Sequence, residues 1–391
     1  MDSPVLEPDI TLATVLAQAE RAANVVAQVR GAVLAPEARK QPPRFTTGQV
    51  MQAVGLTKPQ MDYALRKGDL PSGELTGAVK RREFSLGEYQ EWVRAYHPQE
   101  QRPQGAQGLV VSIANFKGGV SKTTVALTLA QGLSLRGHRV LVVDTDPQGS
   151  ITTLFGILPD TEVQDEDTVL PLVQGAQASI RYAIRPTYWS GIDLVAAAPL
   201  LFGAEFALAD RMAAQPGFEY WRVLERGLAD VLGDYDVVLL DTPPALTYTT
   251  LNVLMASDGI IMPLPPNALD FASSAQFWRL FGDIASGLPG AMDKRFSFIN
   301  VLPAKVESTD AAGAEVRAWM GAAYGERLMP AEVPKSAATS TASANFGTVY
   351  DASVGSSRTV KRATDAFDRL VDAVLVQCVT AWRKQLAEGA R

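Results

Sequence analysis

The fold is decided by one stretch, residues 115–124, which reads Asn-Phe-Lys-Gly-Gly-Val-Ser-Lys-Thr-Thr. It directly follows an apolar run, Leu109–Ala114, and directly precedes a helical pattern of apolar residues. A glycine-rich turn between a strand and a helix lets backbone N–H groups surround an anion at the helix N-terminus. Lys122 then neutralises phosphate charge, and Thr123 offers a hydroxyl to Mg²⁺. The stretch therefore predicts a triphosphate-binding loop.

The loop departs from the strict P-loop pattern, because Phe116 and Ser121 stand at the positions of its two glycines. With Lys117 as a second lysine, residues 117–124 nevertheless resemble the deviant Walker A motif of the ParA/MinD family of ATPases, although Ser121 replaces the commoner glycine. The resemblance implies ATP and ADP as ligands with Mg²⁺, and a Lys117 that reaches across an ATP-sandwiched dimer to the partner's nucleotide. It also implies nucleotide contacts from Lys117, Gly118, Gly119, Val120, Ser121, Lys122, Thr123 and Thr124.

Two further strand patterns deliver carboxylates to the same edge of the sheet. Residues 140–149 read Val-Leu-Val-Val-Asp-Thr-Asp-Pro-Gln-Gly, and residues 237–244 read Val-Val-Leu-Leu-Asp-Thr-Pro-Pro, which has the form of a Walker B strand. Carboxylates beside a phosphate loop hold Mg²⁺ through water or orient the attacking water. By resemblance, Asp146 orients the water, Asp144 is a Mg²⁺-side or structural acid, and Asp241 orders water on Mg²⁺, with a γ-phosphate switch after it.

These elements together predict nucleotide hydrolysis, and the resemblance implies that the nucleotide is ATP and that a trans Lys117 makes turnover depend on dimerisation. Phosphoryl transfer to water requires mostly positioning and charge neutralisation, so a site that lacks part of its cationic set hydrolyses slowly. Lys117, Lys122 and Asp146 are the predicted catalytic residues, and Thr123, Asp144 and Asp241 the predicted metal-side residues. The structural alternatives are a glycine-rich turn with surface lysines and strand ends that carry solvated aspartates.

Apolar runs alternate with helical patterns over the rest of the chain. This alternation predicts an α/β fold with a mostly parallel sheet flanked by helices, in which ligands lie at the strand carboxyl ends. Residues 336–355 predict a long loop, and Arg358 to about Leu386 a final amphipathic helix. The predicted strands are Leu109–Ala114, His138–Val143, Ile192–Ala197, Tyr235–Leu240, Asp258–Leu264, Phe296–Leu302 and a weaker run at Leu328–Val333.

Before the phosphate loop, the pattern changes to helices separated by linkers. Apolar residues from Asp9 to about Leu34 recur at helical spacing, so this helix must pack against another domain or another chain. Residues 36–43 and 98–107 are rich in Pro or Gln and predict linkers. The expected organisation is an N-terminal helix (1–36), a DNA-binding domain (44–97), a linker (98–107) and an ATPase domain (108–391).

Residues 45–84 have the spacing of a winged helix-turn-helix. A short helix, a turn at Gly55 and a second helix over Lys58–Lys67, with Thr57 as its N-cap, follow in order, and residues 68–84 predict a wing. Lys58–Arg82 holds six basic and three acidic residues, a local charge of +3. Predicted DNA contacts are Lys58, Arg66, Lys67, Lys80, Arg81 and Arg82. A purely structural helix pair is the alternative.

This organisation resembles the larger, type Ia plasmid partition ATPases. The resemblance implies a dimerisation helix, a winged domain that represses the partition operon, and a homodimer that binds DNA without sequence preference when it holds ATP. It also implies stimulation by a ParB-type centromere-binding protein and a nucleoid-associated location. Arg358, Lys361 and Arg362 lie where such proteins place a nonspecific DNA-binding patch; a solvated helix start is the alternative.

Composition excludes several other classes. The chain of 391 residues has one cysteine, Cys378, and two histidines, which excludes a disulfide framework and a nitrogenase-reductase-like cluster site. An acidic N-terminus and the lack of an apolar run of about 20 residues indicate a cytoplasmic protein without a membrane span. A MinD-like membrane-associated ATPase and a nucleotide-switched repressor without a partition role remain the alternatives.

The net charge of −6 does not exclude nucleic acid. It is a sum over the whole chain, in which the acidic tract Asp160–Asp167 outweighs the basic clusters at Lys58–Arg82 and Arg358–Arg362. Such a distribution predicts DNA binding that is conditional on dimerisation or ATP and strongly dependent on salt.

Overall fold

The computed structural model describes residues 11–33, 40–77, 80–307, 310–335, 347–351 and 358–389. The chain divides into two compact units, Met1–Lys40 and Gln41–Arg391. In the first unit, α1 (Leu12–Val33) is the predicted amphipathic helix, and its apolar residues Leu12, Val15 and Leu16 are exposed. Nothing in the described part of that unit covers them, so their packing against another domain or chain stays a prediction.

The second unit is built on an eight-stranded sheet in the order β11-β10-β9-β4-β8-β5-β7-β6. All neighbouring strands are parallel except β6 and β7. Each predicted apolar run contains or overlaps one of these strands, which confirms the fold class; the short edge strand β6 was not predicted. The strands are β4 (Leu109–Ile113), β5 (Val140–Asp144), β6 (Arg185–Pro186), β7 (Ile192–Val195), β8 (Val237–Asp241), β9 (Gly259–Leu264), β10 (Phe298–Val306) and β11 (Val333–Pro334).

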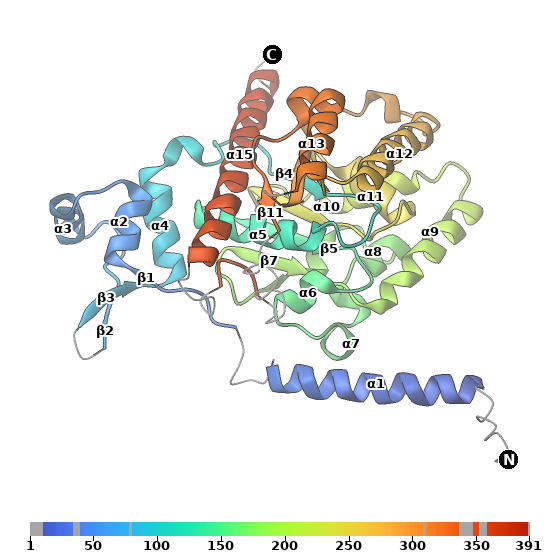
Figure 1. Ribbon diagram of the computed structural model, residues 1–391, viewed down its shortest axis with the longest axis horizontal. Helices are drawn as coiled ribbons and strands as arrows, with labels where there is room; N and C mark the ends of the chain where they lie inside the picture. Colours follow the sequence, from blue (N-terminus) through green and yellow to red (C-terminus); the bar gives the residue numbers. More distant parts are fainter. Residues whose placement is uncertain are drawn as a thin grey trace. The chain divides into compact units, whose positions relative to one another are not determined.

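Helices cover both faces of the sheet because successive strand residues point to opposite sides. Val111 packs into the layer of α5 (Lys122–Leu135) and α15 (Arg358–Gly389), whereas Val110 packs into the opposite layer. Helices α5 and α15 lie side by side (Figure 1). The remaining helices are α6 (Ser150–Leu154), α7 (Pro159–Glu162), α8 (Leu170–Gln174), α9 (Gly203–Ala214), α10 (Val223–Leu228), α11 (Tyr248–Ala256), α12 (Ala268–Ser286) and α13 (Ala311–Tyr324).

Residues 45–84 contain two helices and an antiparallel strand pair where the sequence predicts the helix pair and wing, and a further helix follows them. Gly55 ends the first helix in the left-handed region, with φ 70°, and Thr57 begins the second with a capping box to Gln60. Of the expected small core, Val50, Val54 and Met61 are buried, whereas Leu56 and Leu65 are only partly buried. The elements are β1 (Phe45–Thr46), α2 (Thr47–Val54), α3 (Lys58–Lys67), β2 (Glu74–Thr76), β3 (Arg81–Phe84) and α4 (Leu86–Tyr96).

The predicted linker at 98–107 is a packed connection rather than a free spacer. The Arg102 guanidinium donates to the Asp236 carboxylate at 2.8 Å and to the main chain of Ala106, which is itself buried. Gln101 of the same segment donates to the carbonyl of Arg136 at 3.1 Å. Outside the segment, the buried Gln90 of α4 donates to the hydroxyl of Ser134 in α5 at 2.6 Å. Because polar side chains make these contacts, the low apolar content of the segment concealed them.

The predicted loop at 336–355 is described only at residues 347–351; its remaining residues lie outside the described part. This short piece is tied to α5 by the Thr348 hydroxyl, which donates to Gln131. It is tied to the connection between β6 and β7 by Asp351, which accepts from the Tyr188 hydroxyl at 2.5 Å. No helix in the described part of the chain has the length and apolarity needed to cross a bilayer.

Candidate functional site

The three predicted motifs meet at one edge of the sheet, because β4, β8 and β5 are parallel neighbours. Asp144 and Asp241 end β5 and β8 and are register partners. The loop after β4 carries Lys117 and leads into α5, whose first residue is Lys122. This edge consists of strand carboxyl ends, where ligands of open α/β sheets bind.

The loop after β4 is shaped as an anion cradle. Gly119 and Ser121 both adopt the left-handed region, with φ 73° and 76°. A Cβ atom built on Gly119 would meet nothing within 4 Å, so space is open beside the loop, while Val120 anchors it from the buried side. The first N–H groups of α5, including those of Thr123 and Thr124, lack carbonyl partners within their own helix and favour an anion there.

Lys122, Thr123 and Asp241 form the inner part of the site. The buried Lys122 ammonium donates to the carbonyl of Lys117 at 2.9 Å, and burial lowers the pKa of Lys122, opposed by the nearby Asp241 and Asp146. The Thr123 hydroxyl donates to Asp241 Oδ2 at 2.8 Å. Burial raises the pKa of Asp241, whose Oδ1 is buried without a hydrogen-bond partner among the described residues. This unpartnered acceptor beside a hydroxyl fits a water ligand of Mg²⁺.

Asp144 is fully buried and holds the loop that presents Asp146. Its Oδ2 accepts from the Thr152 amide at 3.0 Å and hydroxyl at 2.7 Å, and its Oδ1 accepts from the Asp146 amide at 3.1 Å. Burial, reinforced by Asp241, raises the pKa of Asp144 well above its usual value. Asp144 was predicted to be either a structural acid or an acid beside Mg²⁺, and these contacts favour the structural role. A contribution of Asp144 to Mg²⁺ binding stays a prediction.

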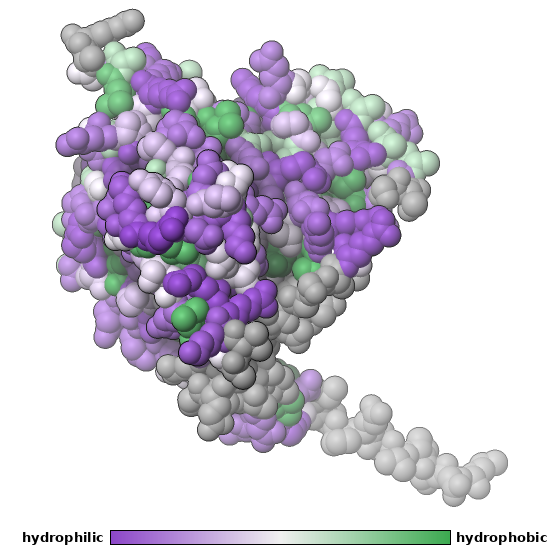
Figure 2. Space-filling model, turned by 90° about the vertical axis from the view of Figure 1, so that its left-hand side faces the viewer, coloured by the Kyte–Doolittle hydropathy of each residue, from purple (hydrophilic) through white to green (hydrophobic). Residues whose placement is uncertain are grey.

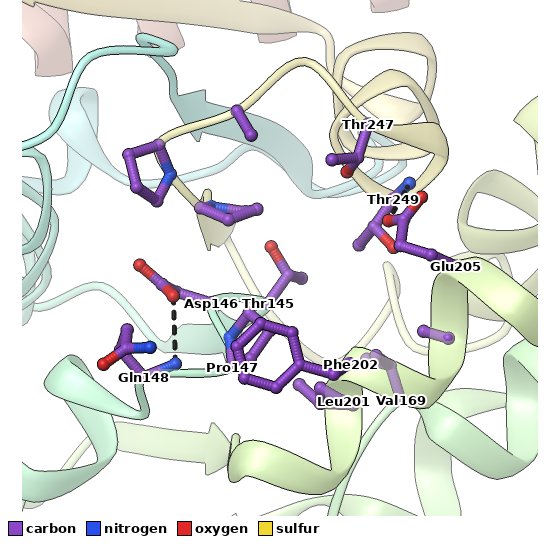
Figure 3. A pocket seen from close by; sticks show the side chains of 14 residues that line it. Thr145, Asp146, Pro147, Gln148, Val169, Leu201, Phe202, Glu205, Thr247 and Thr249 are labelled. Carbon is purple, nitrogen blue, oxygen red and sulfur yellow. Dashed lines mark hydrogen bonds between the residues drawn. The ribbon is translucent and has the colours of Figure 1, made fainter. Parts of the chain in front are cut away.

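The predicted water-orienting residue, Asp146, lies at the rim of this group. Its carboxylate accepts from the Gln148 amide at 3.0 Å, and burial raises its pKa while Lys122 lowers it. A mostly apolar cavity of about 240 Å³ adjoins Asp146 between the loops that follow β5 and β8 (Figure 3). Pro243, Pro244 and Ala245, which follow Asp241 where the γ-phosphate switch is predicted, also line this cavity.

The Lys117 side chain has a partner that the sequence did not reveal. Its ammonium forms an ion pair with Asp270 of α12, a side chain that is only 9% exposed. A local signal existed: Asn267 and Asp270 have capping-box spacing directly after β9, and β9 is a neighbour of β4. A helix that starts there must begin beside the phosphate loop.

Glu205 of α9 is a second residue that the sequence did not reveal. Its carboxylate accepts from the amides of Tyr248 at 2.9 Å and Thr249 at 3.0 Å, and so caps the N-terminus of α11. Helix α11 follows Asp241 and the switch segment, so Glu205 fixes the far end of that segment. Glu205 also lines the cavity beside Asp146 (Figure 3).

The predicted DNA contacts lie on the surface of the second unit. Lys58 begins α3, and Arg358, Lys361 and Arg362 lie in the first turns of α15. The face that carries α2, α3 and the wing is predominantly hydrophilic (Figure 2). Two predicted contacts have partners within the chain: Lys67 pairs with Asp69 at 2.5 Å, and Arg82 donates to the carbonyl of Ser72. Lys58, Arg66, Lys80 and Arg81 are exposed and form no ion pair with the described residues.

Comparison with known proteins identifies the family. A family described as an AAA domain (AAA_31) matches residues 108–289. The chromosome-partitioning ATPase Soj of Thermus thermophilus is 32% identical over 225 residues, which are 58% of this chain and 80% of Soj. This chain belongs to the ParA/Soj family of partition ATPases. The ParA-type chain is also 33% identical to the protein SopA of Escherichia coli over 254 residues, 64% of this chain and 66% of SopA.

Solved structures share the fold of this chain. A cobyrinic acid a,c-diamide synthase from Mycobacterium smegmatis, solved with an ATP analogue and magnesium, is 28% identical, with a TM-score of 0.54 over 68% of this chain and 94% of that one. A structure described as a partition protein matches 93% of this chain and 99% of its own length with a TM-score of 0.66 at 20% identity, which extends the likeness of fold beyond the ATPase part. The phosphate site of this ParA-type chain is that of a P-loop ATPase.

Proposed function

We propose that this ParA-type ATPase segregates DNA by a nucleotide-controlled cycle. It dimerises on ATP, binds nucleoid DNA without sequence preference in that state, and is released when a ParB-type centromere-binding protein stimulates its weak hydrolysis. The helix pair and wing of residues 44–97 recognise the operator of its own operon. The observation that carries the proposal is the gathering of Lys122, Thr123, Asp146 and Asp241 at one sheet edge, in a chain that also presents exposed basic groups.

Each residue of the phosphate site has a separate role in ATP hydrolysis. Lys122 and the first N–H groups of α5 neutralise the β- and γ-phosphates. Thr123 and Asp241 hold Mg²⁺ and its water, which supplies further charge neutralisation, and Asp144 keeps the loop of Asp146 in place through Thr152. Asp146 orients the attacking water. Because Asp270 holds Lys117 away from the inner group of its own chain, full turnover awaits Lys117 of a partner chain.

The basic groups at the start of α15 support a DNA-binding role. Arg358, Lys361 and Arg362 stand at the positive end of a 32-residue helix, where cations are unfavourable for stability by a few tenths of a kcal/mol each. These cations do not stabilise the start of the helix. DNA phosphates that bind there would be attracted both by the side-chain charges and by the helix dipole.

The test is DNA binding by the full-length chain with ATP, with ADP and without nucleotide, on random-sequence DNA and on the DNA upstream of its own reading frame. We expect ATP to promote binding to random DNA and the operator complex to respond differently to the nucleotide. Lys122→Ala is the matched control and should respond to neither nucleotide. If neither DNA responds to nucleotide in the unsubstituted chain, the proposal fails.

The trans role of Lys117 gives a separate prediction. Lys117→Ala should bind ATP as the unsubstituted chain does, because the inner group of Lys122, Thr123 and Asp241 remains intact, but it should lose hydrolysis. The measurement pairs nucleotide affinity with phosphate release at protein concentrations that span dimerisation. Equal turnover in the variant and the unsubstituted chain would remove the argument for a trans lysine.

A nucleotide-switched repressor without a partition role is the second candidate. The contact between α4 and the carboxyl end of α5 favours it, because α5 begins at the phosphate loop and Gln90 binds Ser134 near its other end. The two candidates differ at Asp146. Asp146→Ala should leave operator binding intact in both, but it should trap the protein on nonspecific DNA only if hydrolysis drives a partition cycle.

A further inference from the structure

The first three residues of the phosphate loop, Asn115–Lys117, each contact β9 or α12. The Asn115 amide donates to the carbonyl of Pro263 at the end of β9 at 3.0 Å. The ring of Phe116 stacks on Phe277 of α12 with centroids 5.6 Å apart. Lys117 completes the series through its ion pair with Asp270. Helix α12 therefore holds the segment that carries the trans-acting lysine.

Asp270 is placed to attract an ammonium group. It is the third residue of α12, its side chain is 9% exposed, and Asn267 donates to its Oδ2 while the Asp270 amide donates to Asn267 Oδ1 at 2.9 Å. A carboxylate with so little access to water costs free energy unless a cation or donors compensate it. Lys117 is the cation that compensates it in this chain, and 39% of its own side chain remains exposed.

We propose that Asp270 is a positioning residue that holds Lys117 on its own chain until nucleotide and a partner chain compete for it. This inference rests on the proposed function, in which Lys117 acts across the dimer. The Lys117 ammonium must then leave a buried carboxylate to reach the partner's phosphates. The ion pair thereby raises the ATP concentration needed for dimerisation and keeps the chain monomeric and inactive at low ATP.

The test removes the charge of Asp270 and keeps its shape. Asp270→Asn retains an oxygen that accepts from Asn267, so α12 keeps its cap, while the ion pair to Lys117 is removed. If Lys117 is free in about one-tenth of the unsubstituted molecules, the variant should dimerise at roughly tenfold lower ATP concentration. Sedimentation of the full-length chain over an ATP titration measures this. Asp283→Asn, an exposed change on the same helix where Asp283 pairs with Arg279, should leave the titration unchanged.

A double substitution separates this role from a merely structural one. In the Lys117→Ala background, Asp270→Asn should produce no further shift, because the group that Asp270 holds is absent. A shift of equal size in both backgrounds overturns the proposal. Asp270→Gln, which keeps a capping-box acceptor at the same helix position, repeats the measurement if Asp270→Asn does not fold.

The outcomes of this experiment also distinguish failure of the proposed role of Asp270 from failure of the proposed function. An unsubstituted chain that does not dimerise on ATP overturns the proposed function itself. A chain that dimerises on ATP, with an Asp270→Asn variant that needs the same or more ATP, overturns the role of Asp270 alone. As a second readout, the Lys117 amine should react faster with an acylating reagent in Asp270→Asn than in the unsubstituted chain without nucleotide; equal rates contradict the ion pair.

Discussion

The phosphate site and the basic surface of the helix pair and wing both use cations, but they hold them differently. Lys122 is buried, bonded to a loop carbonyl and close to Asp241 and Asp146. Lys80 and Arg81 stand exposed at the wing. A buried charge with fixed partners holds a ligand in one geometry, so its removal should weaken ligand binding severely. Exposed charges attract a ligand through screened electrostatic interactions that add up, so the removal of each one should have a small effect. The expected effects of substitution follow this difference.

The largest effect is expected for Lys122→Ala. Truncating one partner of a buried, hydrogen-bonded charge pair costs about 2–5 kcal/mol, so ATP affinity should fall by roughly 30- to 4,000-fold. Calorimetric titration with a non-hydrolysable ATP analogue measures this. Lys361→Ala, an exposed lysine on α15, is the control and should bind the analogue normally. A Lys122→Ala variant with unchanged affinity would show that the loop does not hold the phosphates.

The next effect is expected for Asp146→Ala, which removes the water-orienting carboxylate and leaves the bonds of Asp144 to Thr152 intact. Positioned proton transfer contributes on the order of 10²- to 10⁴-fold, so phosphate release should fall by about that factor while analogue binding changes little. Single-turnover hydrolysis and analogue titration are measured together. Loss of binding in step with hydrolysis would assign Asp146 to the architecture of the loop instead.

A smaller, salt-dependent effect is expected for the wing. Lys80→Gln with Arg81→Gln should weaken DNA binding and lower the slope of log affinity against log salt by about 0.9 for each DNA phosphate that the variant no longer neutralises. Fluorescence anisotropy on one DNA over several salt concentrations gives the slope. The paired control is Lys335→Gln with Lys384→Gln, two exposed lysines that form ion pairs elsewhere. An unchanged slope would remove the wing from the DNA interface.

The parts of the fold and of the site that could be predicted from the sequence are those with a local sequence signal. The strands, the phosphate loop, Asp241 and the capped helix α3 carry local signals: apolar runs, glycine spacing and capping residues. The pairing of Lys117 with Asp270 does not: the local spacing of Asn267 and Asp270 indicates a helix start, and only the neighbouring places of β4 and β9 in the sheet bring Asp270 to Lys117. Polar contacts between distant segments have no periodicity to reveal them.

The packed segment at 98–107 shows the same limit. Gln101 donates to the carbonyl of Arg136 at 3.1 Å, and Arg102 binds Asp236, yet glutamine and arginine in a Pro- and Gly-containing run are typical of linkers. The short edge strand β6, Arg185–Pro186, contains a proline and too few residues to form an apolar run. Composition therefore predicts segments that pack through apolar surface, and it misses those that pack through hydrogen bonds.

The smallest effect is expected within the phosphate loop itself, at Ser121. Its left-handed backbone, φ 76° and ψ 22°, costs a residue with a Cβ atom about 1–2 kcal/mol, and its side chain makes no capping hydrogen bond in return. Ser121→Gly removes that strain but adds about 0.5–1 kcal/mol of chain entropy to the unfolded state. We therefore expect Ser121→Gly to raise the free energy of unfolding by about 0.5–1 kcal/mol, which corresponds to a rise of about 1–2 °C in the melting temperature.

Gly119→Ser is the matched reverse of that substitution. Gly119 has nearly the same φ, 73°, and nothing lies within 4 Å of its built Cβ, so backbone strain alone should destabilise the variant by about 1–2 kcal/mol. Calorimetric melting of both variants without nucleotide tests the pair. If Ser121→Gly raises the melting temperature and Gly119→Ser lowers it, the left-handed backbone accounts for both changes in stability. A Ser121→Gly variant that melts lower than the unsubstituted chain would instead give the Ser121 side chain a stabilising role in the loop.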